Sequence, residues 1–438
     1  MNIRKLFCPG NTPRILLFLF FFVVSAITTI ACGYTEKNAT GNVLLLFLLL
    51  LLAHRNTLTS ITALLFLFCC ALYAPAGMTY GKINNSFIVA LLQTTTDEAA
   101  EFTGMIPVYH FLVSAAIQVF MVIFWRTHRR GHRNWLALLL FVLCSVNSWP
   151  LRMVKGTVVG TTDTLREMQR YKQLNQHGAD NWKILPGVPL YDTIVIVTGE
   201  SVRRDYMSVY GYPVPTTPWL NTAPGLFIDG YTSAAASTVP SLSRTLIYDY
   251  EQNPDSGNNV VALAAKAGYS TWWISNQGKL GEHDTRISVI ASDAEHTVFL
   301  KKGSFASRKT DDMLLLQETE RALADKSSPK VIFLHMMGSH PNPCDRLHSW
   351  PNNYQEQFPR KIACYLASIS KLDNFLGQLD GILRRHSRHF AMLYFSDHGL
   401  SVSDSANPVH HDGHVQGGYS VPLIITASDI TSHQSVSR

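Results

Sequence analysis

Five apolar stretches in the first 150 residues constrain the fold more than any other feature. They cover residues 16–31, 43–53, 61–74, 108–125 and 135–146. Some of them need flanking Thr, Gly, Ser or Asn residues to reach the ~20 residues that cross a bilayer. We therefore expect residues 1–150 to form a helical membrane domain with about five spans. A removable signal peptide would explain the first stretch but not the four that follow.

Basic residues flank these stretches in a pattern that predicts orientation. They precede the first stretch, lie between the second and third, and separate the fourth from the fifth: Arg4, Lys5, Arg14, His54, Arg55, Arg126, Arg129, Arg130 and Arg133. Positive flanks stay in the cytoplasm, so an odd number of spans places everything after residue 150 on the opposite face. We expect a multi-pass protein of a bacterial inner membrane with its chemistry in the periplasm.

Two polar segments border the membrane domain. Residues 86–94 form an apolar run followed by Thr95–Glu98, which favours a helix on the outer membrane surface, although a plain connector fits as well. Residues 151–190 become polar and predict an amphipathic linker along that surface. The net charge of +6 comes from basic residues clustered at apolar flanks, which indicates membrane topology rather than nucleic-acid binding.

The remaining residues, 191–438, predict an α/β domain. Short β-branched or aromatic runs at 191–198, 269–275, 330–335 and 389–395 alternate with helical patterns at 260–267, 310–324 and 362–384. This alternation is typical of a mainly parallel central sheet. In such sheets the ligand site lies beyond the carboxyl ends of the strands.

Polar residues fall at these strand ends. Glu200 follows the first run, the segment His335–His340 follows the third, and Asp397 with His398 follows the fourth. Each alone is more often a helix cap, a salt-bridge partner or a surface group than a ligand. Together, Glu200, Asp397 and His398 offer two carboxylates and one imidazole at one sheet edge, which suits Zn²⁺ or Mn²⁺.

The segment 231–244 is rich in small hydroxyl residues and lacks apolar periodicity. One interpretation is a flexible loop in which Thr238 or Ser241 caps a helix. The other is a nucleophile at a helix start, where a metal lowers the pKa of the hydroxyl and helix amides hold a phosphate. These residues alone leave both interpretations open.

The ordered motifs resemble those of the bacterial phosphoethanolamine transferases, membrane-anchored members of the alkaline phosphatase and sulfatase superfamily. The resemblance covers nearly the whole chain and rests on the five stretches and on the strings Val197–Ser201, Tyr210–Tyr212, Thr217-Pro218, Thr238–Ser241, Gly338–Pro341, Ser396–Gly399 and His411. The strings Ser275–Gly278, Gly338–Asp345 and Tyr394–Leu400 look closest to the branch that decorates osmoregulated periplasmic glucans. The resemblance implies a sulfatase-like catalytic domain at 191–438.

The resemblance also implies a site and a reaction. Glu200, Thr238, Asp397 and His398 would bind Zn²⁺, and Thr238 would be the nucleophile that takes phosphoethanolamine from phosphatidylethanolamine and passes it to a glycan or lipopolysaccharide acceptor. Thr238 is preferred because counting back from Pro240 reaches Ala235, which has no hydroxyl. The implied substrate contacts are His340, His411, Asn276, Lys279, Thr94 and Glu98. We expect a monomer without nucleic-acid partners.

Some features depart from the family pattern. Ala90 stands where an Asn is common, no cysteines flank the nucleophile segment, and the chain ends soon after an expected strand at 423–426, which suggests a truncated domain edge. Cys344 and Cys364 are implied as a disulfide that closes a loop of about 20 residues, worth roughly 3 kcal/mol, with two free thiols as the alternative.

Three competing functions are a phosphoglycerol transferase, a sulfatase and an inactive membrane scaffold. A sulfatase usually needs Cys or Ser in a Cys/Ser-x-Pro-x-Arg context, which residues 238–244 lack. Zinc content and a phosphorylated Thr238 would distinguish an enzyme from a scaffold.

Overall fold

The computed structural model describes residues 12–34, 39–54, 56–83, 88, 103–104, 106–127, 135–146, 148–174, 180–248, 257–278, 286–301, 310–402 and 409–437. The predicted site residues Thr94, Glu98 and Lys279 lie outside these ranges, as does all of the predicted surface helix except Ile88. The chain divides into two compact units, Met1–Thr164 and Leu165–Arg438, which we describe separately.

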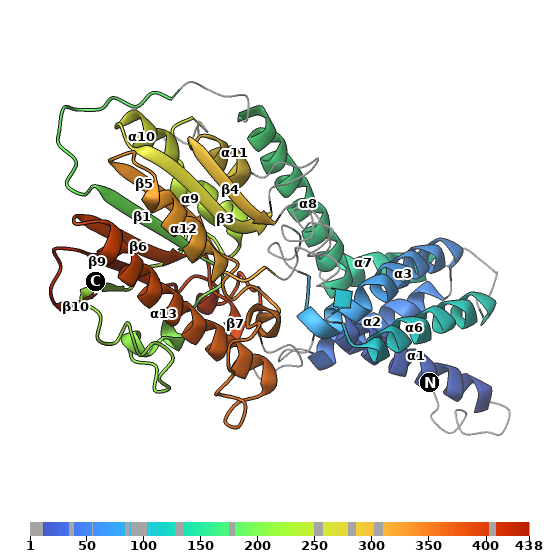
Figure 1. The fold of residues 1–438 in the computed structure, drawn as a ribbon. Coiled ribbons are helices and arrows are strands. Elements are labelled where there is room, and N and C mark those ends of the chain that lie inside the picture. Colours follow the sequence, from blue (N-terminus) through green and yellow to red (C-terminus); the bar gives the residue numbers. More distant parts are fainter. Residues whose placement is uncertain are drawn as a thin grey trace. The chain divides into compact units, whose positions relative to one another are not determined.

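The first unit is helical. Its helices are α1 (Thr12–Ala31), α2 (Ala39–Ala53), α3 (Thr57–Tyr80), α6 (Val108–Thr127), α7 (Trp135–Val146) and the start of α8 (Trp149–Leu174), as Figure 1 shows. Among the described residues, α3 and α6 are long and apolar enough to cross a membrane, and α7 with the first part of α8 would make a third span despite a 58° bend. Helices α1 and α2 are apolar but shorter. Two or three candidate spans thus stand where the sequence predicts about five.

Helices α3 and α6 pack through polar contacts as well as apolar ones. Pro75 lies inside α3 and cannot donate to the carbonyl of Ala71. Ser114 of α6 donates to that carbonyl instead, at 2.6 Å. One turn before Ser114, the imidazole of His110 lies 2.9 Å from the hydroxyl of Thr79. Hydrogen bonds between helices are favoured where no water is available, so this pairing suits helices inside a bilayer.

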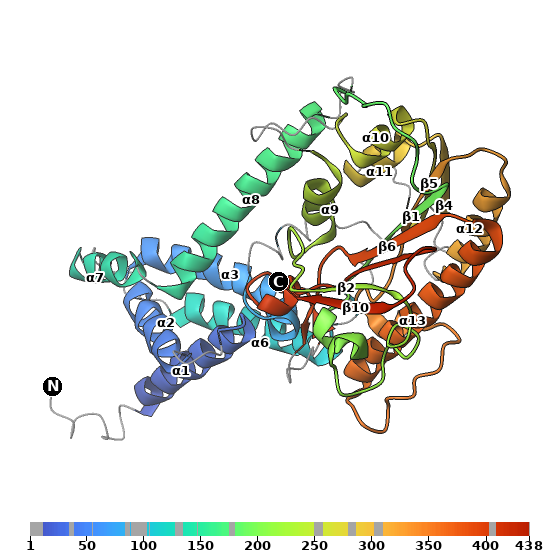
Figure 2. The same cartoon turned by 90° about the vertical axis from the view of Figure 1, so that its left-hand side faces the viewer.

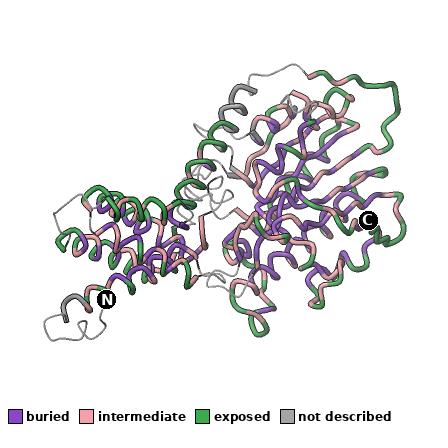
Figure 3. Tube along the Cα trace, turned by 180° about the vertical axis from the view of Figure 1, so that it is seen from behind, coloured by how far each residue is buried: buried purple, intermediate pink, exposed green. Residues whose placement is uncertain are grey.

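Large apolar side chains cover the outside of the first unit. Leu65, Leu72, Val108, Leu112 and Trp135 are each more than 60% exposed, and the outer helical turns are exposed in Figure 3. Apolar surface on this scale indicates contact with lipid or with another protein rather than with water.

An eight-stranded sheet organises the second unit. Its strands are β1 (Thr193–Gly199), β2 (Gly225–Asp229), β3 (Ser270–Gly278), β4 (His296–Lys301), β5 (Lys330–His335), β6 (Phe390–Ser396), β9 (Leu423–Ala427) and β10 (His433–Ser437). Their order is β10-β2-β9-β6-β1-β5-β3-β4. Strand β9 pairs antiparallel with both β6 and β2, while the other strand pairs of this sheet are parallel. The sheet is therefore mainly parallel, as predicted.

Helices cover both faces of this sheet, as Figure 2 shows. Helices α12 (Leu314–Ala324) and α13 (Arg360–His386) pack on the face that receives Val195 and Val197 of β1. Helices α9 (Thr238–Leu246), α10 (Val260–Lys266) and α11 (Arg286–Ser292) pack on the other face, which receives Ile194 and Ile196. Alternate residues of β1 thus enter two cores, which explains why the strand is a continuous β-branched run.

Three central strands end at the same sheet edge. The register pairs Thr198 of β1 with His335 of β5, and Gly199 with Ser396 of β6. Residues that follow these strands in sequence therefore emerge close together. At the far edge of the sheet, β10 follows β9 and pairs with β2, so the residues after the expected last strand add one more strand.

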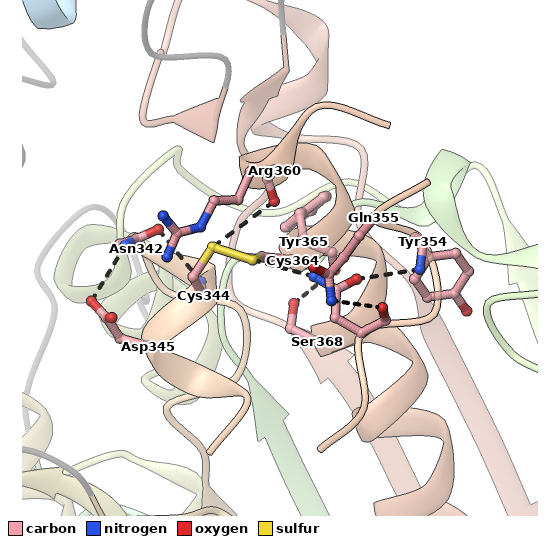
Figure 4. Close-up of a disulfide and its surroundings, with 10 residues drawn as sticks. Asn342, Cys344, Asp345, Tyr354, Gln355, Arg360, Cys364, Tyr365 and Ser368 are labelled. Atoms are coloured by element: carbon pink, nitrogen blue, oxygen red, sulfur yellow. Dashed lines mark hydrogen bonds between the residues drawn. A yellow bond between two sulfur atoms is a disulfide. The ribbon is translucent and has the colours of Figure 1, made fainter. Parts of the chain in front are cut away.

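A disulfide links the segment between β5 and α13 to the start of α13. Cys344, in the short helix η6 (Pro343–Arg346), is bonded to Cys364 in the first turns of α13, 20 residues later (Figure 4). The enclosed residues Leu347 and Tyr354 pack against Ala363 and Leu366 in a small core of their own. The disulfide therefore holds a local cluster against α13, next to the segment that carries His340.

Candidate metal centre and active site

The side chains of Glu200, Asp397 and His398 form a buried cluster at the carboxyl edge of the sheet. Each is at most 1% exposed, and one ligand atom from each lies within 4.8 Å of the others. His398 Nε2 is 3.1 Å from Glu200 Oε1 and 3.5 Å from Asp397 Oδ2. Two carboxylates and an imidazole in this arrangement could hold a divalent cation.

Surrounding hydrogen bonds orient this cluster. His398 Nδ1 donates to the carbonyl of Gly399 at 2.8 Å, which turns Nε2 toward the carboxylates. Asp397 Oδ1 accepts from the backbone N–H groups of Ser201 and His398, at 3.1 and 2.7 Å. Asp397 Oδ2 is buried and accepts no hydrogen bond from any residue that the structure describes. A buried carboxylate oxygen that accepts no hydrogen bond is free to coordinate a metal ion.

The electrostatics of the cluster favour an added positive charge. Burial and the neighbouring Glu200 raise the pKa of Asp397 to about 8. Burial opposes the charge on Glu200 too, but His398 outweighs it and holds the pKa of Glu200 well below its usual range. Burial lowers the pKa of His398, yet the two carboxylates raise it overall to about 9. A divalent cation would balance both carboxylates without a proton on either.

The hydroxyl of Thr238 faces this cluster. Thr238 is the first residue of α9, and its Oγ1 donates to Glu200 Oε2 at 3.0 Å and lies 3.4 Å from His398 Nε2. One turn later, Ser241 Oγ donates to the backbone carbonyl of Asp397 at 2.5 Å. Of the two hydroxyls that the sequence left open, Thr238 therefore joins the cluster, whereas Ser241 ties α9 to the loop that carries Asp397.

Two predicted substrate-binding histidines lie beside the cluster. The ring centroid of His411 is 4.9 Å from that of His398 and 5.8 Å from that of His340. His340 Nδ1 donates to the carbonyl of Pro341 at 2.7 Å, which leaves its Nε2 available. Burial and the adjacent histidines hold the pKa of His411 well below its usual value, and its Nδ1 is buried without a partner among the described residues. His411 is thus a neutral imidazole at the site.

His335 belongs to the same edge, although the sequence analysis did not select it as a site residue. It is the last residue of β5 and 4% exposed, and its Nε2 is buried with no partner in the described part of the chain. Burial lowers the pKa of His335 to about 4, although the nearby Glu200 opposes this. The available signal was its position: it ends a strand that pairs with the strand before Glu200.

The structure places Asn276 in a supporting position. Asn276 is fully buried at the end of β3, and its Nδ2 donates to the carbonyl of Thr310 at 2.9 Å and to Asp312 Oδ1 at 2.8 Å. Its Oδ1 is buried, and no described residue donates to it. The described hydrogen bonds of Asn276 therefore lead to the segment just before α12 and not to Thr238 or the cluster of Glu200, Asp397 and His398.

Comparisons with known proteins agree with this geometry. Residues 192–438 match the sulfatase family model. Over 450 aligned residues, the chain is 31% identical to the phosphoethanolamine transferase OpgE of Escherichia coli, covering 95% of this chain and 84% of OpgE.

Two solved structures share the fold. The lipooligosaccharide phosphoethanolamine transferase A (EptA) of Neisseria meningitidis, an integral membrane protein, aligns with a TM-score of 0.60 and 17% identity over 95% of this chain and 88% of its own. The periplasmic domain of EptC from E. coli, in complex with Zn, aligns with a TM-score of 0.52 and 22% identity. The alignment covers 57% of this chain and 76% of the EptC chain. Together with the sulfatase match and the identity to OpgE, these findings show that the chain belongs to the sulfatase family and is one of its phosphoethanolamine transferases.

Proposed function

We propose that this enzyme takes phosphoethanolamine from phosphatidylethanolamine onto Thr238 and passes it to a glycan or lipopolysaccharide acceptor of the cell envelope, with release of diacylglycerol. The observation that carries the proposal is the position of the Thr238 hydroxyl, 3.0 Å from Glu200 and 3.4 Å from His398. A hydroxyl at a helix start beside a cluster of metal-binding groups is arranged for nucleophilic attack on phosphorus.

The residues present fit a zinc site. Glu200, Asp397 and His398 would hold the ion, with Thr238 as a fourth ligand, and Mn²⁺ suits the same donor atoms. When bound, Zn²⁺ supplies positive charge that lowers the pKa of the Thr238 hydroxyl and neutralises the phosphoryl oxygens. The zinc in the related EptC structure supports this assignment.

The reaction proceeds in two displacements. In the first, Glu200 orients the Thr238 hydroxyl, a bond forms between Thr238 Oγ1 and phosphorus, and the bond from phosphorus to the diacylglycerol oxygen breaks. Thr238 passes its proton to the Glu200 carboxylate, and the leaving oxygen gains a proton from His340, because His411 is a neutral imidazole. In the second, an acceptor oxygen attacks phosphorus and gives its proton to His340, the bond from phosphorus to Thr238 Oγ1 breaks, and Thr238 Oγ1 takes its proton back from Glu200.

The membrane unit presents the donor in this proposal. Phosphatidylethanolamine stays in the bilayer, so five spans with a cytoplasmic amino terminus would hold a periplasmic catalytic domain over the inner membrane. Thr94 and Glu98 would contact the ethanolamine headgroup, while Asn276 and Lys279 would lie near the phosphate. The chain would act as a monomer. The identity to OpgE supports an acceptor among the osmoregulated periplasmic glucans.

A donor comparison tests the proposal. The full chain in detergent is mixed with vesicles of either phosphatidylethanolamine or phosphatidylglycerol, and diacylglycerol release is followed with wild type and Thr238→Ala. We expect release from phosphatidylethanolamine by wild type only. Release from phosphatidylglycerol alone would identify a phosphoglycerol transferase, and release from neither lipid, with no bound zinc, would indicate an inactive scaffold.

A further inference from the structure

The carboxylate of Asp312 joins two strand ends at the active-site edge. Its Oδ1 accepts from the backbone N–H of Met337 at 2.9 Å and from Asn276 Nδ2 at 2.8 Å. Its Oδ2 accepts from the backbone N–H of Gly338 at 2.8 Å. Three donors on one carboxylate tie the end of β3 to the loop after β5, from a residue that lies just before α12.

That loop lies directly against Glu200. The N–H of Ser339 donates to the carbonyl of Glu200 at 2.9 Å. Gly338 has a positive φ of 50°, and a Cβ at this position would lie 2.6 Å from the Glu200 carbonyl oxygen. Only glycine allows this approach and this backbone conformation. Two residues later the chain reaches His340, so the place of Gly338 sets the start of the segment that carries this histidine.

Asp312 supplies the hydrogen-bond acceptors for two consecutive backbone N–H groups of this loop. Met337 is 5% exposed, and its N–H and that of Gly338 both end on the same carboxylate. Hydrogen bonds to an ionised acceptor are stronger than those between neutral groups. An asparagine of the same shape would replace one acceptor oxygen with an NH₂ group, so one of the three donors would then face another donor.

We propose that Asp312 is a positioning residue for the transfer reaction: its carboxylate fixes the loop from Met336 to His340 against Glu200 and thereby places His340 beside His411. The inference rests on the proposed function, because it assigns a role within the same site. Asp312 itself touches neither the ligand cluster nor Thr238 through a described hydrogen bond. Outer-shell residues of this kind typically change activity or metal affinity by about 10- to 100-fold when they are replaced.

The test compares Asp312→Asn with Asp373→Asn in the full chain. Asp373 is a matched control, because its carboxylate also accepts two consecutive backbone N–H groups, those of Trp219 and Leu220, each at 2.9 Å. Three quantities are measured in detergent: the Tm, the zinc affinity by chelator competition, and kcat and KM for phosphatidylethanolamine per folded protein. We expect Asp312→Asn to lower kcat by about 10- to 100-fold with KM near the wild-type value, whereas Asp373→Asn keeps the wild-type kcat.

Each remaining outcome decides the proposal. A wild-type kcat in folded Asp312→Asn, or an equal loss of kcat in both variants, would overturn it, since activity would then be independent of the loop or would merely follow stability. If Asp312→Asn does not fold, Gly338→Ala displaces the same loop from the opposite side and must lower kcat in the same way.

If wild type transfers no phosphoethanolamine, the proposed function fails. The zinc affinity then decides for Asp312: an affinity that is about tenfold weaker in the variant supports the inference, and an equal affinity contradicts it.

Discussion

Thr238 Oγ1 donates a hydrogen bond to Glu200 Oε2 across 3.0 Å. The two residues come from different elements: Thr238 is the first residue of α9, and Glu200 comes directly after β1. Because Glu200 is 1% exposed and also accepts from Ser201 Oγ at 2.6 Å, its carboxylate is held in place and orients the threonine hydroxyl. The protein therefore aligns the proposed nucleophile before any substrate arrives.

The first prediction concerns the ligand role of Glu200. Glu200→Gln should weaken zinc binding by at least about 100-fold, because a neutral amide replaces a charged carboxylate. Replacing a residue that only holds a metal ligand in place already lowers metal affinity by about 10- to 100-fold. Chelator competition on the full chain measures the affinity. Glu320→Gln is the control, because Glu320 is an exposed partner of Arg385 on the protein surface. Equal zinc affinity of Glu200→Gln and wild type would exclude Glu200 as a ligand.

The second prediction concerns the glycine after His398. A Cβ on Gly399 would lie 2.1 Å from the Gly417 carbonyl oxygen and 2.9 Å from Arg203 Cγ, so Gly399→Ala must displace the backbone beside His398. A misplacement of about 1 Å lowers activity by about 100-fold, which we expect for kcat/KM. Gly187→Ala should be neutral, because the nearest atom to its Cβ is 4.0 Å away. Similar kcat/KM values for the two alanine variants would show that the loop has room to move.

The third prediction concerns the disulfide between Cys344 and Cys364, which closes a loop of 20 residues. Replacing both with serine should destabilise the protein by about 3 kcal/mol, because the unfolded chain regains the entropy that the cross-link removes. For a domain of this size the Tm should fall by roughly 5–10 °C. Thermal unfolding in detergent measures this, with Cys144→Ser, a free cysteine in α7, as the control. An unchanged Tm would mean that the local core holds the segment without the cross-link.

The fourth prediction concerns pH and Asp373. Burial raises the pKa of Asp373 to about 6, although two backbone N–H groups favour its charged form. The folded state therefore keeps a proton that the unfolded state has already lost between pH 4 and 6, so this group makes the protein less stable as the pH rises through that window.

Asp373→Asn removes this titration. The stability of wild type relative to the variant should fall by about 2–3 kcal/mol from pH 4 to pH 7. The difference in Tm between the two proteins, measured at both pH values, reports the change. A difference that stays constant with pH would show that Asp373 titrates normally in the folded state.

Several strands of the catalytic unit and the residue cluster at their ends could be predicted from the sequence. The β-branched runs before Glu200 and Asp397 predict buried parallel strands, and parallel strands bring their carboxyl ends together, which is why the cluster of Glu200, Asp397 and His398 could be inferred. Strands β2, β4 and β10 were not predicted, because they are short and contain polar residues that resemble loops. The antiparallel direction of β9 carries no local sequence signal either.

Other parts of the site depend on contacts that no local pattern encodes. The choice between Thr238 and Ser241 needs the direction of each side chain at the start of α9. Asp312 stands in an ordinary polar segment, and its role follows from a loop 25 residues later. In the membrane unit, hydropathy alone predicts apolar stretches, but helix length and bending decide how many of them qualify as spans.

In the proposed reaction, Thr238 carries phosphoethanolamine between donor and acceptor. The most direct test is the intact mass of the purified full chain after incubation with phosphatidylethanolamine, for wild type and Thr238→Ala, with zinc quantified in both. We expect a phosphoethanolamine adduct on wild type that is absent from Thr238→Ala. An adduct that persists in Thr238→Ala, or a zinc-loaded wild type that transfers phosphoethanolamine without ever forming one, would contradict it.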